Sequence, residues 1–315
     1  MFVPILLLLT SCVILFAGAE LLVRGGASLA LKLGLTPLVV GLTVVAYGTS
    51  MPEFVVCVKA ALSGNSEIAI GNVVGSNIFN IAVILGLAAV VYPVTTNLQV
   101  LKWDAPVVLA AALLVPMTFV DGVVSRVEGG VLLVLAILYT WWAVRLAKKD
   151  EAKGREAHID VPEIREKGSV LTDLIKIGAG MGVLVLGSKL LVANAIIMAK
   201  SLGVSDTVIG LTIIAAGTSM PELATSVVAA ARGQSDIALG NVLGSSLFNL
   251  LFVLGGAAAI FPVRTAGLQP FDLYSMMAIT LLMVPFLASG KRLNRVEGLL
   301  LVTCYGIYLA VMWPK

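Results

Sequence analysis

Two glutamates stand inside long apolar stretches, where a charged side chain is costly and usually serves a function. Glu53 and Glu222 each follow the same five residues, Gly-Thr-Ser-Met-Pro. The threonine of each motif, Thr49 or Thr218, is four residues before the glutamate, which puts both side chains on one face of a helix. Carboxylate and hydroxyl oxygens suit hard cations such as Ca²⁺, Mg²⁺ and Na⁺ rather than zinc or copper. The sequence therefore predicts a cation site built from both motifs.

A proline in each motif should interrupt the helix that carries it. Pro52 and Pro221 have no N–H to donate, and their rings clash with the carbonyl four residues earlier. This frees backbone carbonyls on the preceding turn, from Ala46 to Thr49 and from Ala215 to Thr218. We expect a broken helix in each case, with carbonyl oxygens added to the site.

The segment after each motif carries small polar residues at every fourth position, within the pattern Gly-Asn-x-x-Gly-Ser-x-x-Phe-Asn. These residues are Asn72, Ser76 and Asn80 in the first copy and Asn241, Ser245 and Asn249 in the second. Residues four apart share one helix face. We expect the serines and the last asparagine of each copy to contact ions. For Asn72 and Asn241, near the helix starts, ion contact and hydrogen bonding between helices remain equal alternatives.

The sequence contains an internal repeat. Residues 35–53 (LTPLVVGLTVVAYGTSMPE) align with residues 204–222 (VSDTVIGLTIIAAGTSMPE) at an offset of 169 residues. The same offset separates Glu53 from Glu222. The same shift lays residues 71–93 on 240–262 and pairs Arg126 with Arg295. Apolar composition alone would scatter matching leucines and valines, but it would not repeat GTSMPE at one fixed shift. The sequence therefore indicates an internal duplication.

The elements that carry these motifs are expected to cross a membrane. Of 315 residues, 59% are hydrophobic and 12% charged, and the mean hydropathy is +1.04, which excludes an ordinary soluble domain. Ten apolar runs reach about the length of a spanning helix. We predict an all-α membrane protein of ten transmembrane helices, five in each copy. Because five is odd, the copies cross in opposite senses, as in the inverted repeats of secondary transporters.

The predicted organisation is two repeats and a linker. Residues 1–147 form the first repeat, with its motif region at 41–86, and residues 169–315 form the second, with its motif region at 210–255. Residues 148–168 mix charges of both signs and read as a hydrophilic linker. Basic residues near membrane ends favour the cytoplasm. This places the linker inside and both termini outside, in a multi-pass protein of the inner membrane.

The doubled GTSMPE segments, each followed by a GNxxGSxxFN segment, resemble the alpha-repeats of the sodium/calcium exchanger family in the cation/calcium antiporter superfamily. The likeness covers nearly the whole chain, which looks like a compact prokaryotic member. The resemblance implies a transporter, not an enzyme, that exchanges Na⁺ for Ca²⁺ by alternating access.

The same resemblance implies one calcium site and three sodium sites in a single cluster. The calcium ligands would be Glu53, Glu222, Thr49 and Thr218. The sodium ligands would include Ser50, Ser219, Ser76, Ser245 and the carbonyls of Ala46 and Ala215, with Asn80 and Asn249 in the central layer. Three Na⁺ exceed the charge of two carboxylates by one, so exchange would be electrogenic. Asn249 replaces an aspartate of some potassium-dependent relatives, which weakens the case for potassium coupling.

Three other functions are alternatives to sodium/calcium exchange. A proton/calcium antiporter of the same fold would usually carry Asn-Ala before the glutamate, so the hydroxyl pairs here favour sodium. A cation channel would not require inverted halves, and no motif of an intramembrane hydrolase is present. We expect Ca²⁺, Na⁺ and the lipid bilayer as partners, with no cofactor, no nucleic acid and no obligatory protein partner.

Overall fold

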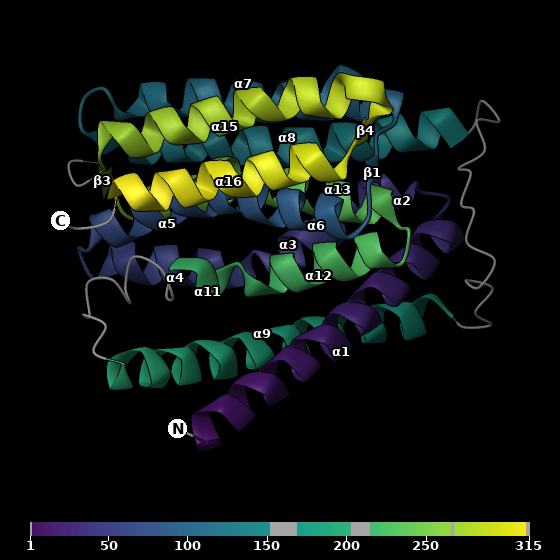
Figure 1. Cartoon of the computed structure of the whole chain (residues 1–315). Helices are drawn as coiled ribbons and strands as arrows, with labels where there is room; N and C mark the ends of the chain where they lie inside the picture. The colour runs from purple at the N-terminus through teal and green to yellow at the C-terminus, as the bar shows by residue number, and fades with distance from the viewer. Residues whose placement is uncertain (1, 152–168, 203–214, 266–267, 313–315) are drawn as a thin grey trace.

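The computed structural model describes residues 2–151, 169–202, 215–265 and 268–312, and these are mostly helical (Figure 1). The helices before the linker are α1 (Phe2–Leu33), α2 (Pro37–Val40), η1 (Gly41–Val45), α3 (Ala46–Thr49), α4 (Met51–Leu62), α5 (Ser66–Phe79), η2 (Asn80–Leu85), α6 (Gly86–Val91), η3 (Val100–Asp104), α7 (Ala105–Leu114), η4 (Val115–Phe119) and α8 (Arg126–Glu151). Those after it are α9 (Val170–Ser201), α11 (Ala215–Thr218), α12 (Met220–Ala231), α13 (Ser235–Phe248), η6 (Asn249–Val253), α14 (Leu254–Ile260), α15 (Pro270–Ala288), η7 (Ser289–Lys291) and α16 (Arg295–Met312).

Many of these helices are long and apolar enough to cross a membrane. Within the described ranges eight qualify, and a ninth is added if the bent pair Pro37–Thr49 and Met51–Leu62 counts as one span. The predicted span 204–231 lies partly outside the described residues, and what is described of it is α11 and the short apolar helix α12. The many apolar helices of the sequence prediction are therefore present.

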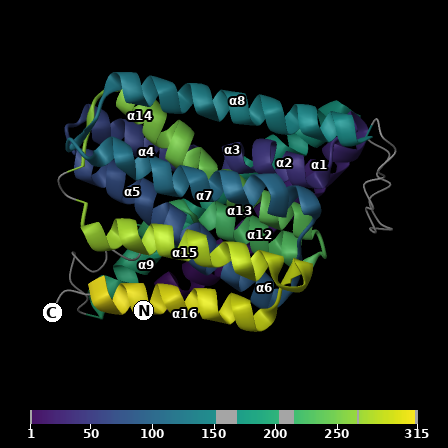
Figure 2. The same cartoon turned by 90° about the horizontal axis from the view of Figure 1, so that it is seen from above.

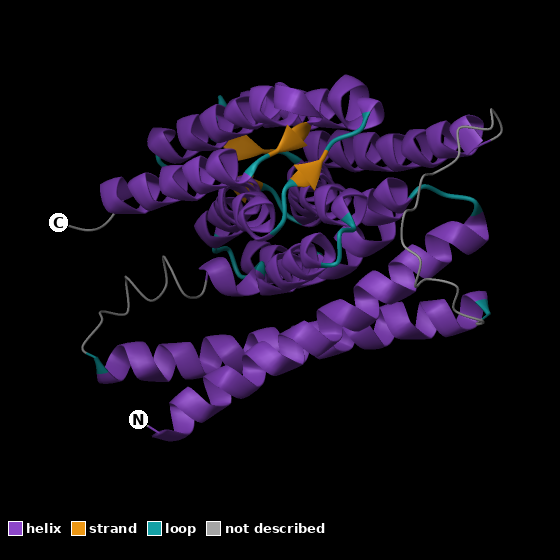
Figure 3. Ribbon diagram, turned by 45° about the vertical axis from the view of Figure 1, so that its right-hand side comes forward, coloured by secondary structure: helices purple, strands orange, loops and turns teal. Residues whose placement is uncertain are grey.

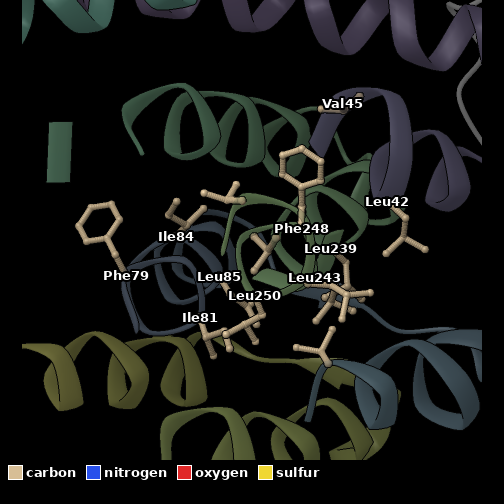
Figure 4. Close-up of a cluster of buried hydrophobic side chains, with 14 of the residues drawn as sticks. Leu42, Val45, Phe79, Ile81, Ile84, Leu85, Leu239, Leu243, Phe248 and Leu250 are labelled. Atoms are coloured by element: carbon tan, nitrogen blue, oxygen red, sulfur yellow. The ribbon is translucent and has the colours of Figure 1, made fainter. Parts of the chain in front are cut away.

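Two continuous helical runs form the centre of the molecule. One run joins α5, η2 and α6, and the other joins α13, η6 and α14. In their most apolar 18-residue stretches, 83% and 94% of the residues are buried. Their side chains and those of η1 belong to one apolar cluster, shown in Figure 4, where Leu85 lies near Leu250 and Leu243. Seen from above, α7 and α15 run across the molecule, and α8 and α16 lie along opposite edges (Figure 2). The polar motif helices are thus held in the most enclosed part of the fold.

The helices α1 and α9 form a crossed pair on one side of the remaining helices (Figures 1 and 3). In their most apolar 18-residue stretches, only 28% and 22% of the residues are buried. They touch closely because glycine has no side chain: a Cβ on Gly18 would lie 2.9 Å from the backbone nitrogen of Leu184. At one end, Lys32 Nζ is 2.6 Å from the buried Asp173 Oδ2. The helices α1 and α9 therefore pack more closely against each other than against the central helices.

The two halves are tied together by short strands in a reciprocal way. Strand β1 (Val94–Thr95) pairs with β4 (Arg292–Leu293), and β2 (Val123–Val124) pairs with β3 (Val263–Arg264), both antiparallel. The shift of 169 residues turns β1 into β3 and β2 into β4, so it converts one pairing into the other.

Close glycine contacts follow the same rule. A Cβ on Gly86 of α6 would lie 2.8 Å from the carbonyl oxygen of Gly298 in α16. A Cβ on Gly255 of α14 would lie 2.9 Å from the carbonyl oxygen of Gly129 in α8. The 169-residue shift relates these two contacts as well. Each half therefore uses the same surfaces to meet the other.

Candidate ion-binding site

Each GTSMPE motif interrupts its helix at the serine. Helix α3 ends at Thr49, Ser50 has φ −86° and ψ 6°, and α4 starts at Met51 with a bend of 45°. In the second motif α11 ends at Thr218, Ser219 has φ −89° and ψ 11°, and α12 follows. The break predicted from the prolines is therefore present in both copies. It places each glutamate in the first turn of a new helix, where the helix dipole stabilises a negative charge.

The two motifs exchange hydrogen bonds with each other. Ser50 Oγ donates to Glu222 Oε1 over 2.7 Å, and Ser219 Oγ donates to Glu53 Oε1 over 2.9 Å. All four side chains are buried. Hydrogen bonds from a hydroxyl to an ionised carboxylate are about 2.5–2.7 Å long, a range that the Ser50–Glu222 bond reaches and the Ser219–Glu53 bond exceeds. The two glutamates and both serines thus form one polar cluster, and Ser76 Oγ joins it at 3.3 Å from Ser219 Oγ.

Asn241 holds the hydroxyl of Thr49 in place. Thr49 Oγ1 lies 3.1 Å from Asn241 Oδ1, to which it can donate. The amide of Asn241 is fixed in turn, because Nδ2 donates to Ser226 Oγ at 2.9 Å and to the carbonyl of Glu222 at 3.3 Å. When the hydroxyl proton points at Asn241, the lone pairs of the Thr49 oxygen are free to face a cation.

Asn72 plays the matching part for Thr218, with a weaker anchor. Thr218 Oγ1 lies 3.4 Å from Asn72 Oδ1, and Asn72 Nδ2 lies 3.3 Å from the sulfur of Cys57. Cys57 occupies the position that Ser226 has in the other half, and a thiol is a poor acceptor. Of the two alternatives left open by the sequence, both asparagines therefore make hydrogen bonds between helices.

The last asparagine of each polar segment begins a stretch of π-helix. Asn80 starts η2 and Asn249 starts η6, and both side chains are buried. Single π-turns inside α-helices are frequent at functional sites. Neither the side-chain oxygen nor the nitrogen of either residue finds a hydrogen-bond partner among the described residues.

Several other buried oxygens in this region share that property. Within the described residues, the atoms without a partner include Glu53 Oε2, Glu222 Oε2, Ser245 Oγ, Ser246 Oγ and Thr225 Oγ1. A buried polar atom without a partner costs free energy, so a group of them requires an explanation. A bound cation would supply the missing partner for the two carboxylate oxygens, Glu53 Oε2 and Glu222 Oε2.

The donor set is rich in oxygen and holds only two acids. No cluster of three or more His, Cys, Asp or Glu residues occurs in the described part of the chain. The remaining side-chain donors of the site are hydroxyls and amides, which suit Ca²⁺ and Na⁺. Two carboxylates can balance one divalent cation.

The predicted site residues are placed as follows. The cluster itself contains Glu53, Glu222, Ser50, Ser219, Ser76, Thr49 and Thr218, each with a hydrogen bond to another motif or to its neighbouring helix. The carbonyl of Ala46 accepts from the Ser50 N–H at 3.1 Å. Ser245, Asn80 and Asn249 are buried but make no side-chain hydrogen bond with a described residue. Ala215 opens α11, and its side chain lies outside the described part. Their roles as ion ligands stay predictions.

Two further polar residues of this region, Thr225 and Ser226, lie outside the predicted site. Thr225 lies three residues after Glu222 in α12, on the same helix face, with its hydroxyl buried. Ser226 anchors Asn241. Spacing from Glu222 could have indicated Thr225. Ser226 could not be found in this way, because its first-half counterpart is Cys57.

The chain is similar to known proteins over almost its whole length. A family model described as sodium/calcium exchanger protein matches residues 3–145 and 174–313. Inner membrane protein YrbG of Escherichia coli (strain K12) is 33% identical over 311 residues, which cover 98% of this chain and 96% of YrbG. Sodium/calcium exchanger MaX1 of Methanosarcina acetivorans is 33% identical over 345 residues, with 99% of each protein covered.

A solved structure has the same fold. The sodium-calcium exchanger NCX_Mj, soaked with zero Na⁺ and Ca²⁺, superposes with a TM-score of 0.85 at 30% identity, covering 98% of this chain and 99% of NCX_Mj. With its many apolar helices, the chain is a multi-pass membrane protein whose relatives are named as exchangers. The chain belongs to the sodium/calcium exchanger family.

Proposed function

We propose that this protein exchanges Na⁺ for Ca²⁺ across the membrane by alternating access. One observation carries the proposal: Glu53 and Glu222 are bridged by the serines of each other's motifs, and each keeps one buried carboxylate oxygen without a partner among the described residues. Such a pair is suited to one divalent cation or to several monovalent ones. The names of MaX1 and NCX_Mj as sodium/calcium exchangers support the same pair of ions.

The proposed ligands divide by ion. Ca²⁺ is held between Glu53 and Glu222, with Thr49 and Thr218 completing the site from the helix breaks. Na⁺ ions use the carboxylates as well and add Ser50, Ser219, Ser76, Ser245 and the carbonyls of Ala46 and Ala215, around a central layer of Asn80 and Asn249. Because both ions need the same carboxylates, they exclude each other.

The same carboxylates couple the two fluxes. An empty site leaves two buried charges unbalanced, which costs several kcal/mol. The protein therefore changes its accessible side readily only when ions are bound. Three Na⁺ against one Ca²⁺ move one net positive charge, so the exchange responds to the membrane potential.

For the architecture, we propose ten spans in two inverted repeats, 1–147 and 169–315, joined by the cytoplasmic linker 148–168, with both termini outside. The reciprocal strand pairs and glycine contacts support this arrangement. The lightly buried pair α1 and α9 is the part that moves against the centre. Alkaline phosphatase fused after Lys315 should be active in cells, and the same reporter placed in the linker should be inactive.

Calcium uptake into liposomes tests the coupling ion. Purified protein is reconstituted in liposomes loaded with sodium, and uptake of radioactive Ca²⁺ is measured after dilution into sodium-free buffer. We expect uptake that needs the sodium gradient and stops when sodium is equal on both sides. Uptake that follows a pH gradient and ignores sodium would instead identify a proton/calcium antiporter.

A further inference from the structure

The C-terminal half of α8 covers a groove that the ion site does not use. This groove has a volume of about 550 Å³ and is lined by Tyr47, Ile137, Thr140, Trp141, Val144, Arg145 and Lys148. Six of these residues are on α8, while Tyr47 comes from α3 on the opposite wall. The volume is in the range of sites for small organic ligands. Figure 2 shows α8 along one edge of the molecule, where lipid can reach it.

The groove has an apolar part and a cationic end. Ile137 and Trp141 are 61% and 52% exposed, as expected of a surface that faces acyl chains. The apolar part of α8 stops at Lys148, so Arg145 and Lys148 lie at the level of the lipid headgroups. The Arg145 guanidinium stacks over the Trp141 ring at 4.1 Å. Neither cation has a carboxylate partner among the described residues.

The repeat does not keep the residues that line this groove. The shift of 169 residues pairs Tyr47 with Ala216, Trp141 with Ala310 and Arg145 with Pro314, which supply neither an aromatic ring nor a cation. Ion binding uses residues from both halves, whereas the groove belongs to one half and to one side of the membrane. Its residues therefore serve something that differs between the two membrane surfaces.

We propose that this groove binds one anionic phospholipid, with the phosphate between Arg145 and Lys148 and an acyl chain along Ile137, Trp141 and Val144. Charge complementarity selects the occupant, because two cations without an acidic partner among the described residues face an apolar channel. Cations at the end of a spanning helix attract anionic lipids, and tryptophan favours the same interfacial level. Tyr47 closes the inner wall, where its hydroxyl bonds to Thr140 Oγ1 and its ring lies 4.2 Å from the ring of Phe248.

Native mass spectrometry of the full-length protein in detergent tests the site. Phosphatidylglycerol and phosphatidylcholine with the same acyl chains are titrated separately, and the bound lipid is counted. We expect one phosphatidylglycerol with clear preference over phosphatidylcholine. In the double variant Arg145→Gln and Lys148→Gln the affinity should fall about 30-fold. Arg126→Gln is the matched control, because Arg126 is an exposed cation at the other end of α8.

A second variant separates the groove from general surface charge. Val144→Trp keeps both cations and fills the channel, so it too should abolish the preference for phosphatidylglycerol. Free glycerol phosphate should not compete at equal concentration, because it lacks the acyl chain. Equal binding of the two lipids by the unmodified protein, unchanged binding in Val144→Trp, or full competition by glycerol phosphate would each overturn the proposal. The assay involves no ion transport, so its result is independent of the proposed exchange.

Discussion

At the scale of single residues, the site depends on which oxygen atoms already have partners. Each serine of a GTSMPE motif satisfies one oxygen of the opposite glutamate and leaves the other oxygen available. The threonine hydroxyls lie 3.1 Å and 3.4 Å from the side-chain oxygens of Asn241 and Asn72. Each glutamate therefore keeps one buried carboxylate oxygen that has no hydrogen-bond partner among the described residues.

Neutralising either central acid should stop exchange. Glu53→Gln or Glu222→Gln keeps the size of the side chain but removes one of two charges that balance a divalent ion. Breaking a buried charge pair costs about 3 kcal/mol or more, so Ca²⁺ uptake in liposomes should fall about 100-fold. Glu67→Gln serves as control, because Glu67 is an exposed acid in the first turn of α5. Full exchange by either central variant would refute the site.

Removing the amide that orients Thr49 should weaken ion binding without abolishing transport. Asn241→Ala removes the hydrogen bond to the threonine, worth about 1 kcal/mol, together with the two bonds that anchor the amide to Ser226 and to the Glu222 carbonyl. It should raise the half-saturating Ca²⁺ concentration several-fold with a smaller change in maximal rate. Asn72→Ala should have a weaker effect, since its contacts are longer. Asn77→Ala is the control, because the hydrogen bond that Asn77 makes within the described residues is to the carbonyl of Val73 in its own helix. Equal effects at Asn77 and Asn241 would argue for a purely structural role.

At the scale of elements, close glycine contacts decide how the helices of the two halves meet. At Gly86 and Gly298, and at Gly129 and Gly255, the backbones approach to distances that no side chain could fill. In a membrane, where lipid is as apolar as leucine, such close packing is a main source of helix association. These contacts fix α8 and α16 against the central helices and so support the site from outside.

Two neighbouring glycines of α8 should differ sharply in their tolerance of alanine. A Cβ on Gly129 would lie 2.5 Å from the backbone nitrogen of Ala259, whereas a Cβ on Gly130 has no described atom within 4 Å. Gly129→Ala should therefore lower the free energy of unfolding by about 1–3 kcal/mol. Gly130→Ala should be neutral or slightly stabilising, because alanine favours helix. Thermal unfolding in detergent measures both, and similar melting temperatures would contradict the packing.

At the scale of the whole molecule, the sequence predicts the local features of the site, and the contacts between distant helices are visible only in the structure. The helix breaks at Ser50 and Ser219 were predictable, because a proline acts on its own turn. The duplication was equally visible in the repeated motifs. The serine–glutamate exchange between motifs was not, since it depends on how distant helices pack. The residues that accept hydrogen bonds from Asn72 and Asn241 were not predictable either. They are Cys57 and Ser226, which occupy equivalent positions in the repeat but differ in type.

The proposed stoichiometry makes the whole molecule sensitive to voltage. Exchange of internal Na⁺ for external Ca²⁺ carries one net positive charge out of a liposome, so an interior-positive potential should accelerate Ca²⁺ uptake. With about 2.3 kcal/mol per charge for 100 mV, the limiting Ca²⁺ accumulation should change about 40-fold. Potassium gradients with valinomycin set the potential. Uptake that does not change with potential would exclude a net charge of one.

The reciprocal strand pairs have a consequence for how the chain is made. Strand β2 has its partner in β3, and β1 has its partner in β4, so the strands of the first half stay open until the second half is synthesised. In the proposed inverted repeat, the surfaces of one half fit an oppositely oriented copy of that half. Two separately expressed halves would then carry the strand pairs and glycine contacts that join them in the single chain.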